Sequence, residues 1–423
     1  MPQRVTSACL ATALSAALLT GCGVLGGSSS ADGGTRTVTV WLMENSASPD
    51  FLERFTAGFE KDNPGIELDI RIQAWAGIGP RITKALRGTD PPDVIEVGNT
   101  QVAQYAVGDG LENLTLEAVR DLGSEDWLPG LAEPGSVGEA QYGIPWYAAN
   151  RVVVYHKDLF AAAGITKPPA DREEWIRDTR TLNTGPNQGI YLAGQDWYTL
   201  SGFVWDEGGE LAVETGGQWS GALDSRAALA GMAFYKKLQA LGRGPEDADE
   251  EHPPQRDLFA RGNIAQIVAT PGTAKLIEAK NPALRGKIGF FPVPGKTSKR
   301  PGTVFTGGSD LVVPRATDQR RSAIKVVSAL AGDKWQVELA RAMNYVPNKS
   351  RLASAVGTEE GVRTMAEGAK YGRATPSSPK WGEVEAENPI KPYMTKVLRG
   401  ADPKTAARQA SQSITRTLQK YSE

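Results

Sequence analysis

Cysteine and histidine are scarce in this chain. Its 423 residues include two cysteines, Cys9 and Cys22, and two histidines, His156 and His252. Cys9 lies in an apolar N-terminal stretch, and the histidines stand far apart without cysteine partners. We therefore expect neither a disulfide framework nor a zinc site built from these residue types. No metal and no cofactor is expected, and stability must come from packing.

An excess of charge of one sign is also missing. The chain has 47 basic and 49 acidic residues, and no extended basic run interleaved with aromatic residues. This composition argues against nucleic acid as a partner. Tryptophan, by contrast, is plentiful, with ten residues. Large aromatic side chains outside a core need a reason, and stacking on a ligand is one. The length allows two domains, each with its own core.

The N-terminal segment has the features of a secretory signal. Arg4 precedes an apolar stretch, residues 9–19, which is too short to span a bilayer, since that takes about 20 residues. Residues 19–22 (LTGC) resemble a bacterial lipobox, which implies cleavage before Cys22 and a lipid on its thiol. An ordinary signal with an incidental cysteine is the alternative. We predict a signal peptide over residues 1–21, a flexible Gly/Ser tether over 22–35, and a body anchored to the outer face of the cell membrane.

Strands alternate with helices in the first third of the body. This order is typical of βαβ units and a parallel sheet, in which ligands bind beyond the carboxyl ends of the strands. Those ends carry Glu44, Asn45, Trp75 and Asn99. The predicted strands are residues 37–43, 66–72 and 93–97, and the predicted helices begin at Ser48 or span residues 80–87 and 100–107.

A second set of elements follows a break near residues 143–150. A loop-rich stretch carries Trp197, Trp205 and Trp219, and residues 242–254 form an acidic Pro/Gly loop that we interpret as a solvated surface excursion. Residues 306–310 are predicted to precede a strand. The predicted strands are 151–155, 265–269, 287–291 and 311–313, and the predicted helices are 158–163, 171–182, 225–241, 322–331, 334–342 and 411–421.

Several short motifs then stand in a characteristic order, and together they span essentially the whole mature chain. They are the lipobox, ALRGTDPPDVIEV at 85–97, YGIPW at 142–146, VYHKDLFAAAG at 154–164, YVP at 345–347 and PKW at 379–381. Their order resembles the extracellular solute-binding proteins of family 1, the sugar-binding lipoproteins of bacterial ABC importers. Residues 167–175 depart from the family's usual Pro-Pro-Thr-Trp helix start, which concerns local capping only.

The resemblance implies an α/β fold with two lobes that close on a ligand like a hinged clamp. Each lobe would be a mostly parallel sheet flanked by helices, as in periplasmic binding proteins. Three hinge crossings are expected, near residues 148–151, 304–309 and 344–349. The N-terminal lobe would comprise residues 36–149 plus 306–346, and the C-terminal lobe residues 150–305 plus 347–423.

The resemblance also implies a function without catalysis. A monomeric binding protein would capture a carbohydrate and deliver it to the permease subunits of an ABC transporter. A di- or oligosaccharide is preferred to a monosaccharide because several candidate tryptophans could cover more than one sugar ring. A binding protein for a peptide, polyamine or osmolyte is one alternative. A carbohydrate-active enzyme is another, for which carboxylates such as Glu44 and Asp310 would have to face the sugar. Against an enzyme, residues 307–310 lack the G-x-S-x-G spacing, and no P-loop occurs.

Aromatic side chains are predicted to cover the apolar faces of the sugar. Trp146 is the first stacking candidate because Pro145 stiffens its loop, although it could instead pack the hinge. Trp197, Trp205 and Trp381 could each stack on ligand or belong to the core. Trp75 could contact ligand or only pack the wall, and Tyr345 could reach the cleft or pack the hinge.

Polar side chains are predicted to satisfy the sugar hydroxyls, because an unpaired buried hydroxyl costs about 1–3 kcal/mol. The predicted residues are Glu44, Asn45, Asn99 and Asp310. Asn99 would serve equally well as a helix N-cap. Gly308 could let the backbone approach the ligand closely, or could simply form a turn.

Overall fold

The structure, a computed structural model, describes residues 35–75, 77–357 and 359–420. The predicted signal peptide, Cys22 and nearly all of the predicted tether lie outside the described residues. The folded body begins at Arg36. Within this part of the chain, no helix is both long enough and apolar enough to cross a membrane.

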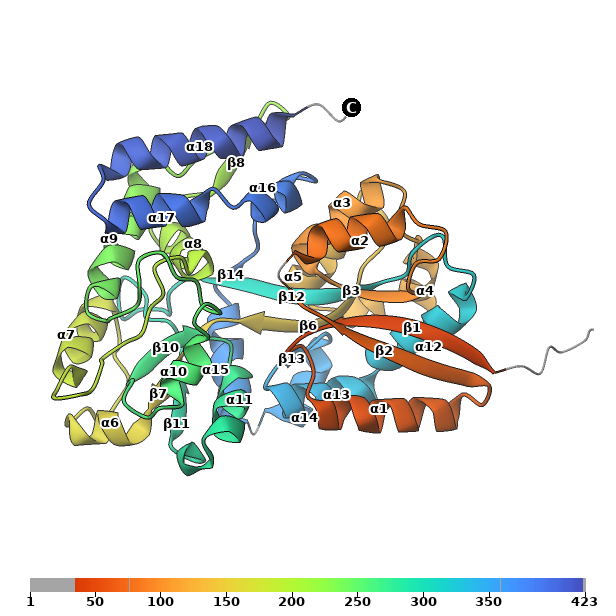
Figure 1. Ribbon diagram of the computed structural model, residues 1–423, viewed down its shortest axis with the longest axis horizontal. Coiled ribbons are helices and arrows are strands. Elements are labelled where there is room, and N and C mark those ends of the chain that lie inside the picture. The colour runs from red at the N-terminus through yellow and green to blue at the C-terminus, as the bar shows by residue number, and fades with distance from the viewer. Residues whose placement is uncertain (1–34, 76, 358, 421–423) are drawn as a thin grey trace, which may run out of the picture. The chain divides into compact units, whose positions relative to one another are not determined.

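Helices and strands alternate along most of the body (Figure 1). The strands are β1 (Arg36–Met43), β2 (Ile66–Gln73), β3 (Val94–Gly98), β4 (Ser136–Val137), β5 (Ala140–Gln141), β6 (Ile144–Asn150), β7 (Val152–His156), β8 (Ala212–Thr215), β9 (Gln218–Gly221), β10 (Gln266–Ala269), β11 (Ile288–Phe291), β12 (Val304–Val312), β13 (Val346–Pro347) and β14 (Gly372–Arg373). The α-helices are α1 (Pro49–Asp62), α2 (Ile78–Leu86), α3 (Val102–Val107), α4 (Thr115–Arg120), α5 (Pro129–Ala132), α6 (Lys157–Ala162), α7 (Arg172–Leu182), α8 (Trp197–Asp206), α9 (Arg226–Gln239), α10 (Gln255–Phe259), α11 (Thr273–Lys280), α12 (Arg320–Leu330), α13 (Asp333–Met343), α14 (Ala353–Val356), α15 (Glu360–Ala369), α16 (Trp381–Glu387), α17 (Ile390–Leu398) and α18 (Pro403–Gln419). Short 3-10 helices are η1 (Asn99–Gln101), η2 (Ser124–Asp126), η3 (Glu133–Gly135), η4 (Pro282–Leu284) and η5 (Ser350–Leu352).

The first lobe is built on a seven-stranded sheet of order β13-β6-β12-β3-β1-β2, in which β14 also pairs with β12. β1 runs parallel to β2 and β3, as predicted. β12 runs antiparallel to β3 and β6 but parallel to β14, and β6 runs antiparallel to β13, so the sheet is mixed. Because side chains alternate along a strand, β1 places Val40 and Leu42 in one core beneath α1 and α13, and Met43 in another with α2 and α3.

Helix α1 forms where Ser48 and Pro49 predicted it. Ser48 Oγ accepts a hydrogen bond from the backbone N–H of Phe51 at 3.3 Å, which satisfies one of the free donors of the first turn. Phe51 and Phe55 are buried, and both rings make T-shaped contacts with Trp335 on α13. The apolar stripe therefore fixes this helix on the sheet.

The second lobe contains the three-stranded sheet β10-β7-β11, and here the prediction of a mostly parallel sheet is wrong. Both outer strands run antiparallel to β7. β10 and β11, which α11 connects, therefore run parallel to each other but lie on opposite sides of β7. The βαβ pattern of the sequence is real, but a strand from earlier in the chain separates its two strands.

Three segments join the lobes, as the fold prediction requires. β6 ends and β7 begins around Arg151, and β13 follows Tyr345. β12 is the longest connection: Phe305 packs in the core of the second lobe, and Leu311 packs in that of the first. Figure 1 shows β6 and β12 crossing between the two groups of elements. The residue-level boundaries of the lobes stay a prediction.

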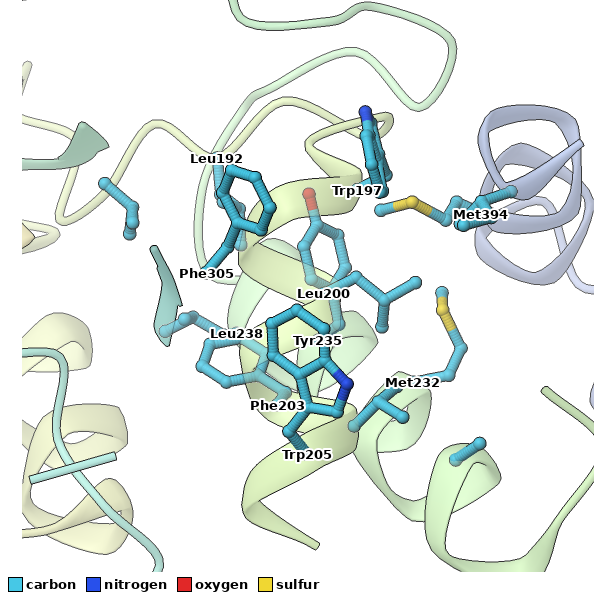
Figure 2. Packing of buried hydrophobic residues seen from close by; sticks show 14 of the residues in the cluster. Leu192, Trp197, Leu200, Phe203, Trp205, Met232, Tyr235, Leu238, Phe305 and Met394 are labelled. Atoms are coloured by element: carbon cyan, nitrogen blue, oxygen red, sulfur yellow. The ribbon is translucent and has the colours of Figure 1, made fainter. Parts of the chain in front are cut away.

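Two local predictions are corrected. The stretch that carries Trp197 and Trp205 is not a loop but the buried helix α8, which Asp196 caps by accepting a hydrogen bond from Thr199 N. A helix that is apolar on all sides shows no helical periodicity. Figure 2 shows α8 enclosed by side chains such as Met232, Tyr235 and Met394.

The segment before the predicted strand 311–313 is also regular. Residues 306–310 belong to β12, and Gly308 pairs with Ala148 of β6. A Cβ atom at Gly308 would lie 2.3 Å from the carbonyl oxygen of Tyr147. Glycine is therefore needed for close strand packing rather than for a turn.

Candidate functional site

A cavity of about 1740 Å³ opens between the two lobes. The first lobe contributes the end of β1, the segment from Gly98 into α3, and part of α2. The second lobe contributes the start of α8, residues 249–256, α11 and α16. The crossing strands supply the floor, with Tyr147, Arg151, Phe305, Ser309 and Tyr345.

Two groups of aromatic rings line this cavity. Trp197 and Tyr198 have ring centroids 4.1 Å apart, and Phe305 lies 4.6 Å from Tyr198. Tyr147 and Tyr345 are stacked at 4.1 Å with an interplanar angle of 5°. Both groups sit where the lobes meet, so a ligand between the lobes would touch aromatic surface from both sides.

Trp75 stands apart from these rings at the first-lobe rim. Its indole Nε1 donates a hydrogen bond to the backbone carbonyl of Glu44 at 3.2 Å. The side chain is held by this bond while 38% of the residue is exposed. A partly exposed, anchored indole offers a ready face for stacking.

Some buried polar atoms in the cavity lining have no hydrogen-bond partner among the described residues. They are Asn99 Nδ2, Gln101 Oε1 and Arg151 Nε, the last of which forms an ion pair with Asp196 at 3.6 Å. An unpaired buried polar atom costs free energy, so such atoms mark positions that a polar ligand or water would satisfy. The three include both donors and an acceptor, which suits hydroxyl groups, because a hydroxyl can donate and accept.

A buried carboxyl group supports the floor of the cavity. Glu96 on β3 accepts hydrogen bonds from Met43 N at 2.7 Å, Ser46 Oγ at 2.7 Å and Tyr147 OH at 3.1 Å. Complete burial raises the pKa of Glu96 to about 7, although these hydrogen bonds oppose the shift. The network fixes Ser46 and Tyr147, which both line the cavity.

A second buried carboxyl group links the lobes. Glu385 on α16 accepts hydrogen bonds from Thr100 Oγ1 of the first lobe, at 3.1 and 3.2 Å, and from Trp381 Nε1 at 2.9 Å. Burial raises the pKa of Glu385 to about 7. Gly382 leaves room for Gln104, because a Cβ atom there would lie 2.1 Å from Gln104 Oε1. Helix α16 thus closes one side of the cavity.

Part of the acidic loop of residues 242–254 forms another wall: residues 249–252 line the cavity, whereas residues 243, 245–247 and 251–253 are exposed, as a solvated excursion predicts. Its backbone bonds to the second lobe, with Gly194 N donating to Pro245 O and Gln195 N to Ala248 O, each at 2.9 Å. Glu250 lies against Arg151 in the cavity lining. The Pro/Gly content of this loop indicates a solvated segment, because composition does not show hydrogen bonds to a neighbouring segment.

Seven of the eleven predicted ligand-binding residues line the cavity: Glu44, Asn45, Trp75, Asn99, Trp197, Gly308 and Tyr345. Asn99 is the first residue of η1 and is not a cap, because the cap positions belong to Gly98 and Gln101. Asn45 has a positive φ of 64°, a conformation that asparagine tolerates, and its carbonyl accepts a hydrogen bond from Tyr345 OH.

The other four predicted residues do not line the cavity, and their predicted ligand contacts are corrected. Trp146 has 0% exposure and packs in the first-lobe core, because alternation along β6 turns Tyr147 to the cavity instead. Trp205 and Trp381 are buried in the second-lobe core. Asp310 is fully buried beside Gly143, and burial raises its pKa well above the usual range.

The structure also separates Glu44 and Asp310, the two carboxylates that would have to face the sugar in a carbohydrate-active enzyme. Glu44 lines the cavity, whereas Asp310 lies in the sheet outside the lining. Among the described residues, no cluster of three or more histidine, cysteine, aspartate or glutamate side chains could hold a metal ion.

The sequence interpretation missed several lining residues: Tyr147, Arg151, Tyr198, Glu250, Phe305 and Glu385. Two of them had a usable signal. Tyr147 alternates with Trp146 in a strand, and Arg151, together with Asn150, separates two largely apolar segments at a predicted crossing. Glu385 and Glu250 had no usable sequence signal, because the residues that they contact, Thr100 and Arg151, lie in distant segments of the chain.

The fold and the cavity define a two-lobed solute-binding protein. The chain matches the family of bacterial extracellular solute-binding proteins over residues 45–337. Diacetylchitobiose binding protein DasA of Streptomyces coelicolor is 36% identical over 384 residues, which cover 90% of each chain. This chain therefore belongs to the bacterial extracellular solute-binding protein family.

Solved structures share the fold at lower identity. The GacH receptor of Streptomyces glaucescens, known unliganded and with acarbose, matches with a TM-score of 0.81 and 22% identity, over 92% of this chain and 100% of that one. An ABC transporter solute-binding protein of Thermotoga lettingae bound with α-D-tagatose matches with a TM-score of 0.81 and 20% identity, over 90% of this chain and 100% of that one.

Proposed function

We propose that this protein captures a carbohydrate, of di- or oligosaccharide size, between its lobes and delivers it to an ABC importer. It acts as a binding protein and not as an enzyme. The observation that carries the proposal is the cavity between the lobes, where aromatic rings and unpaired polar atoms occur together. A pyranose presents both an apolar face and a rim of hydroxyl groups, and this lining is complementary to both.

The size of the cavity favours more than one sugar ring. Its volume of about 1740 Å³ exceeds the roughly 300–1,000 Å³ of ordinary small-molecule sites. Trp75 and Trp197 lie on different lobes, so aromatic side chains line the cavity on both sides, although Trp197 is largely buried. The names of the relatives point the same way, since DasA binds diacetylchitobiose and GacH binds acarbose.

We further propose that the protein works outside the cytoplasm as a monomeric lipoprotein, anchored through Cys22. The support is the lipobox-like sequence at residues 19–22 and the membership in an extracellular family. Intact-mass analysis of membrane-extracted protein should show cleavage before Cys22 and an added lipid mass. An uncut, unmodified N-terminus would contradict the anchor but not the binding function.

Calorimetry tests the binding function on the full-length protein purified in detergent. The panel comprises glucose, N-acetylglucosamine, maltose, cellobiose, N,N′-diacetylchitobiose and maltotriose. Saturable binding of a disaccharide or trisaccharide, tighter than that of either monosaccharide, is expected. Binding of an osmolyte, polyamine or peptide with no response to any sugar would overturn the carbohydrate proposal. Turnover of a bound sugar into smaller products would overturn the assignment as a binding protein.

A further inference from the structure

The loop of residues 242–254 is held in place along most of its length. Gln239 Nε2 donates a hydrogen bond to Gly244 O at 2.7 Å, and Lys391 Nζ on α17 donates to Asp249 Oδ2 at 2.9 Å. Asp249 Oδ1 also accepts hydrogen bonds from the backbone N–H groups of Glu251 and His252. These bonds fix the backbone on both sides of Glu250.

Glu250 faces Arg151 at the first crossing between the lobes. Arg151 Nη2 donates to Glu250 Oε1 at 2.7 Å, and its Nε lies 3.6 Å from Asp196 Oδ1. The guanidinium also lies over the ring of Tyr198, 4.4 Å from the centroid. The side chains of Arg151 and Glu250 keep 16% and 15% exposure, and both line the cavity.

We propose that Glu250, together with Arg151, determines which sugar the cavity selects, and that Asp249 and Lys391, which also line the cavity, hold Glu250 in position. This inference rests on the proposed carbohydrate-binding function and deepens it. A carboxylate has about four acceptor positions, and Arg151 occupies one of them. The remaining positions can accept hydrogen bonds from sugar hydroxyl groups, while Arg151 can donate to a hydroxyl, ring or amide oxygen.

Selectivity follows from the low exposure of this pair. A rigid, buried pair in a cavity between two lobes binds strongly only to a sugar whose polar groups match its geometry. A sugar with a missing or misdirected group leaves the remaining acceptor positions of Glu250, or N–H groups of Arg151, without a hydrogen-bond partner. Flexible surface carboxylates would discriminate less, because water can replace the lost partner.

The test measures dissociation constants for N,N′-diacetylchitobiose, cellobiose and maltose by calorimetry on the full-length protein. Glu250→Gln keeps the size of the side chain and one acceptor oxygen but replaces the second oxygen with an amide N–H donor group. We expect affinity for the preferred sugar to fall about tenfold to a hundredfold, and the preference over the weakest sugar to shrink by tenfold or more. Glu246→Gln, on the same loop but outside the cavity lining, is the matched control and should change each constant by less than about twofold.

Lys391 tests the positioning role. Lys391→Met should lower the preference among the three sugars without abolishing binding, and Lys391→Arg should restore most of it. Unchanged ratios in Glu250→Gln, or an equal loss for all three sugars, would overturn the inference while leaving the carbohydrate function intact. Failure of the wild-type protein to bind any of the six panel sugars would overturn the proposed function and this inference with it. The melting temperature of each variant shows whether a loss of binding reflects unfolding.

Discussion

At the scale of single side chains, two tryptophan residues that were both predicted to contact ligand differ in their exposure to the cavity. Trp75 is anchored by one hydrogen bond to the Glu44 carbonyl and stands at the cavity rim. Trp146 has no exposed surface and lies 5.2 Å from the ring of Tyr147 within the first-lobe core. Substitution should therefore affect binding at one residue and stability at the other.

We expect Trp75→Ala to weaken sugar binding about tenfold to a hundredfold, because an indole at a binding surface is a common energetic hot spot. Its free energy of unfolding should change by less than about 1 kcal/mol. Trp146→Ala should lower the free energy of unfolding by about 3–5 kcal/mol, the usual result for a large core aromatic, with near-normal affinity in the folded fraction. Calorimetry with ligand and denaturant titration without ligand distinguish these patterns, and the reverse result would return Trp146 to the binding site.

Glu96 is another residue whose environment determines its behaviour. Its pKa is about 7 in the folded protein against the usual 4.5, so folding favours the protonated form. Between these two values the unfolded chain loses its proton first. The free energy of unfolding should therefore fall as pH rises from about 4.5 to 7, by up to roughly 3 kcal/mol from this group.

Glu96→Gln should flatten this pH dependence and increase stability above pH 7 relative to the wild type. Urea titrations between pH 4.5 and 8 provide the measurement. The pKa of Glu385 is also raised to about 7, so this group likewise makes the free energy of unfolding fall as pH rises. Glu96→Gln should therefore reduce the pH dependence only in part. Identical slopes in the variant and the wild type would contradict the assignment to Glu96.

At the scale of elements, the packing of α8 on α9 depends on a glycine. A Cβ atom at Gly231 would lie 2.7 Å from the backbone of Val204, so the two helices approach more closely than an alanine allows. Alanine in place of glycine normally stabilises a helix by about 1 kcal/mol. Overpacking of a tight contact costs about 1–3 kcal/mol.

We expect the second effect to dominate, so Gly231→Ala should lower the free energy of unfolding by about 1 kcal/mol or more. Ala230, which directly precedes Gly231 and is exposed on α9, provides the control. Ala230→Gly should cost about 1 kcal/mol through helix propensity alone. A Gly231→Ala protein more stable than the wild type would show that the helices can separate without cost.

At the scale of the whole body, three crossings join lobes with separate cores. Away from these crossings, the hydrogen bond from Thr100 to Glu385 reaches across the cavity. Such an arrangement permits hinge motion about the crossing segments. A ligand shifts this equilibrium only if it binds the closed form more tightly than the open form.

Small-angle scattering should show a smaller radius of gyration with a saturating concentration of the tightest-binding panel sugar. A sugar that calorimetry shows not to bind should leave the radius unchanged, which controls for solvent effects. An unchanged radius at saturation with the binding sugar would contradict closure on the ligand. In that case the lobes would already have their bound arrangement before the ligand enters.

The sequence by itself determined the order of elements and much of the cavity rim. Periodicity and caps predicted β1 and α1, and strand ends predicted Glu44, Asn45, Trp75 and Asn99, because these signals are local. Tertiary structure decided the rest. Contacts between segments far apart in the chain decide which side of β6 faces the cavity and where Glu250 and Glu385 lie. They also decide that β10 and β11 each pair with β7 and not with each other. Local propensities do not encode such long-range packing, so only the folded structure separates a core tryptophan from one at the cavity.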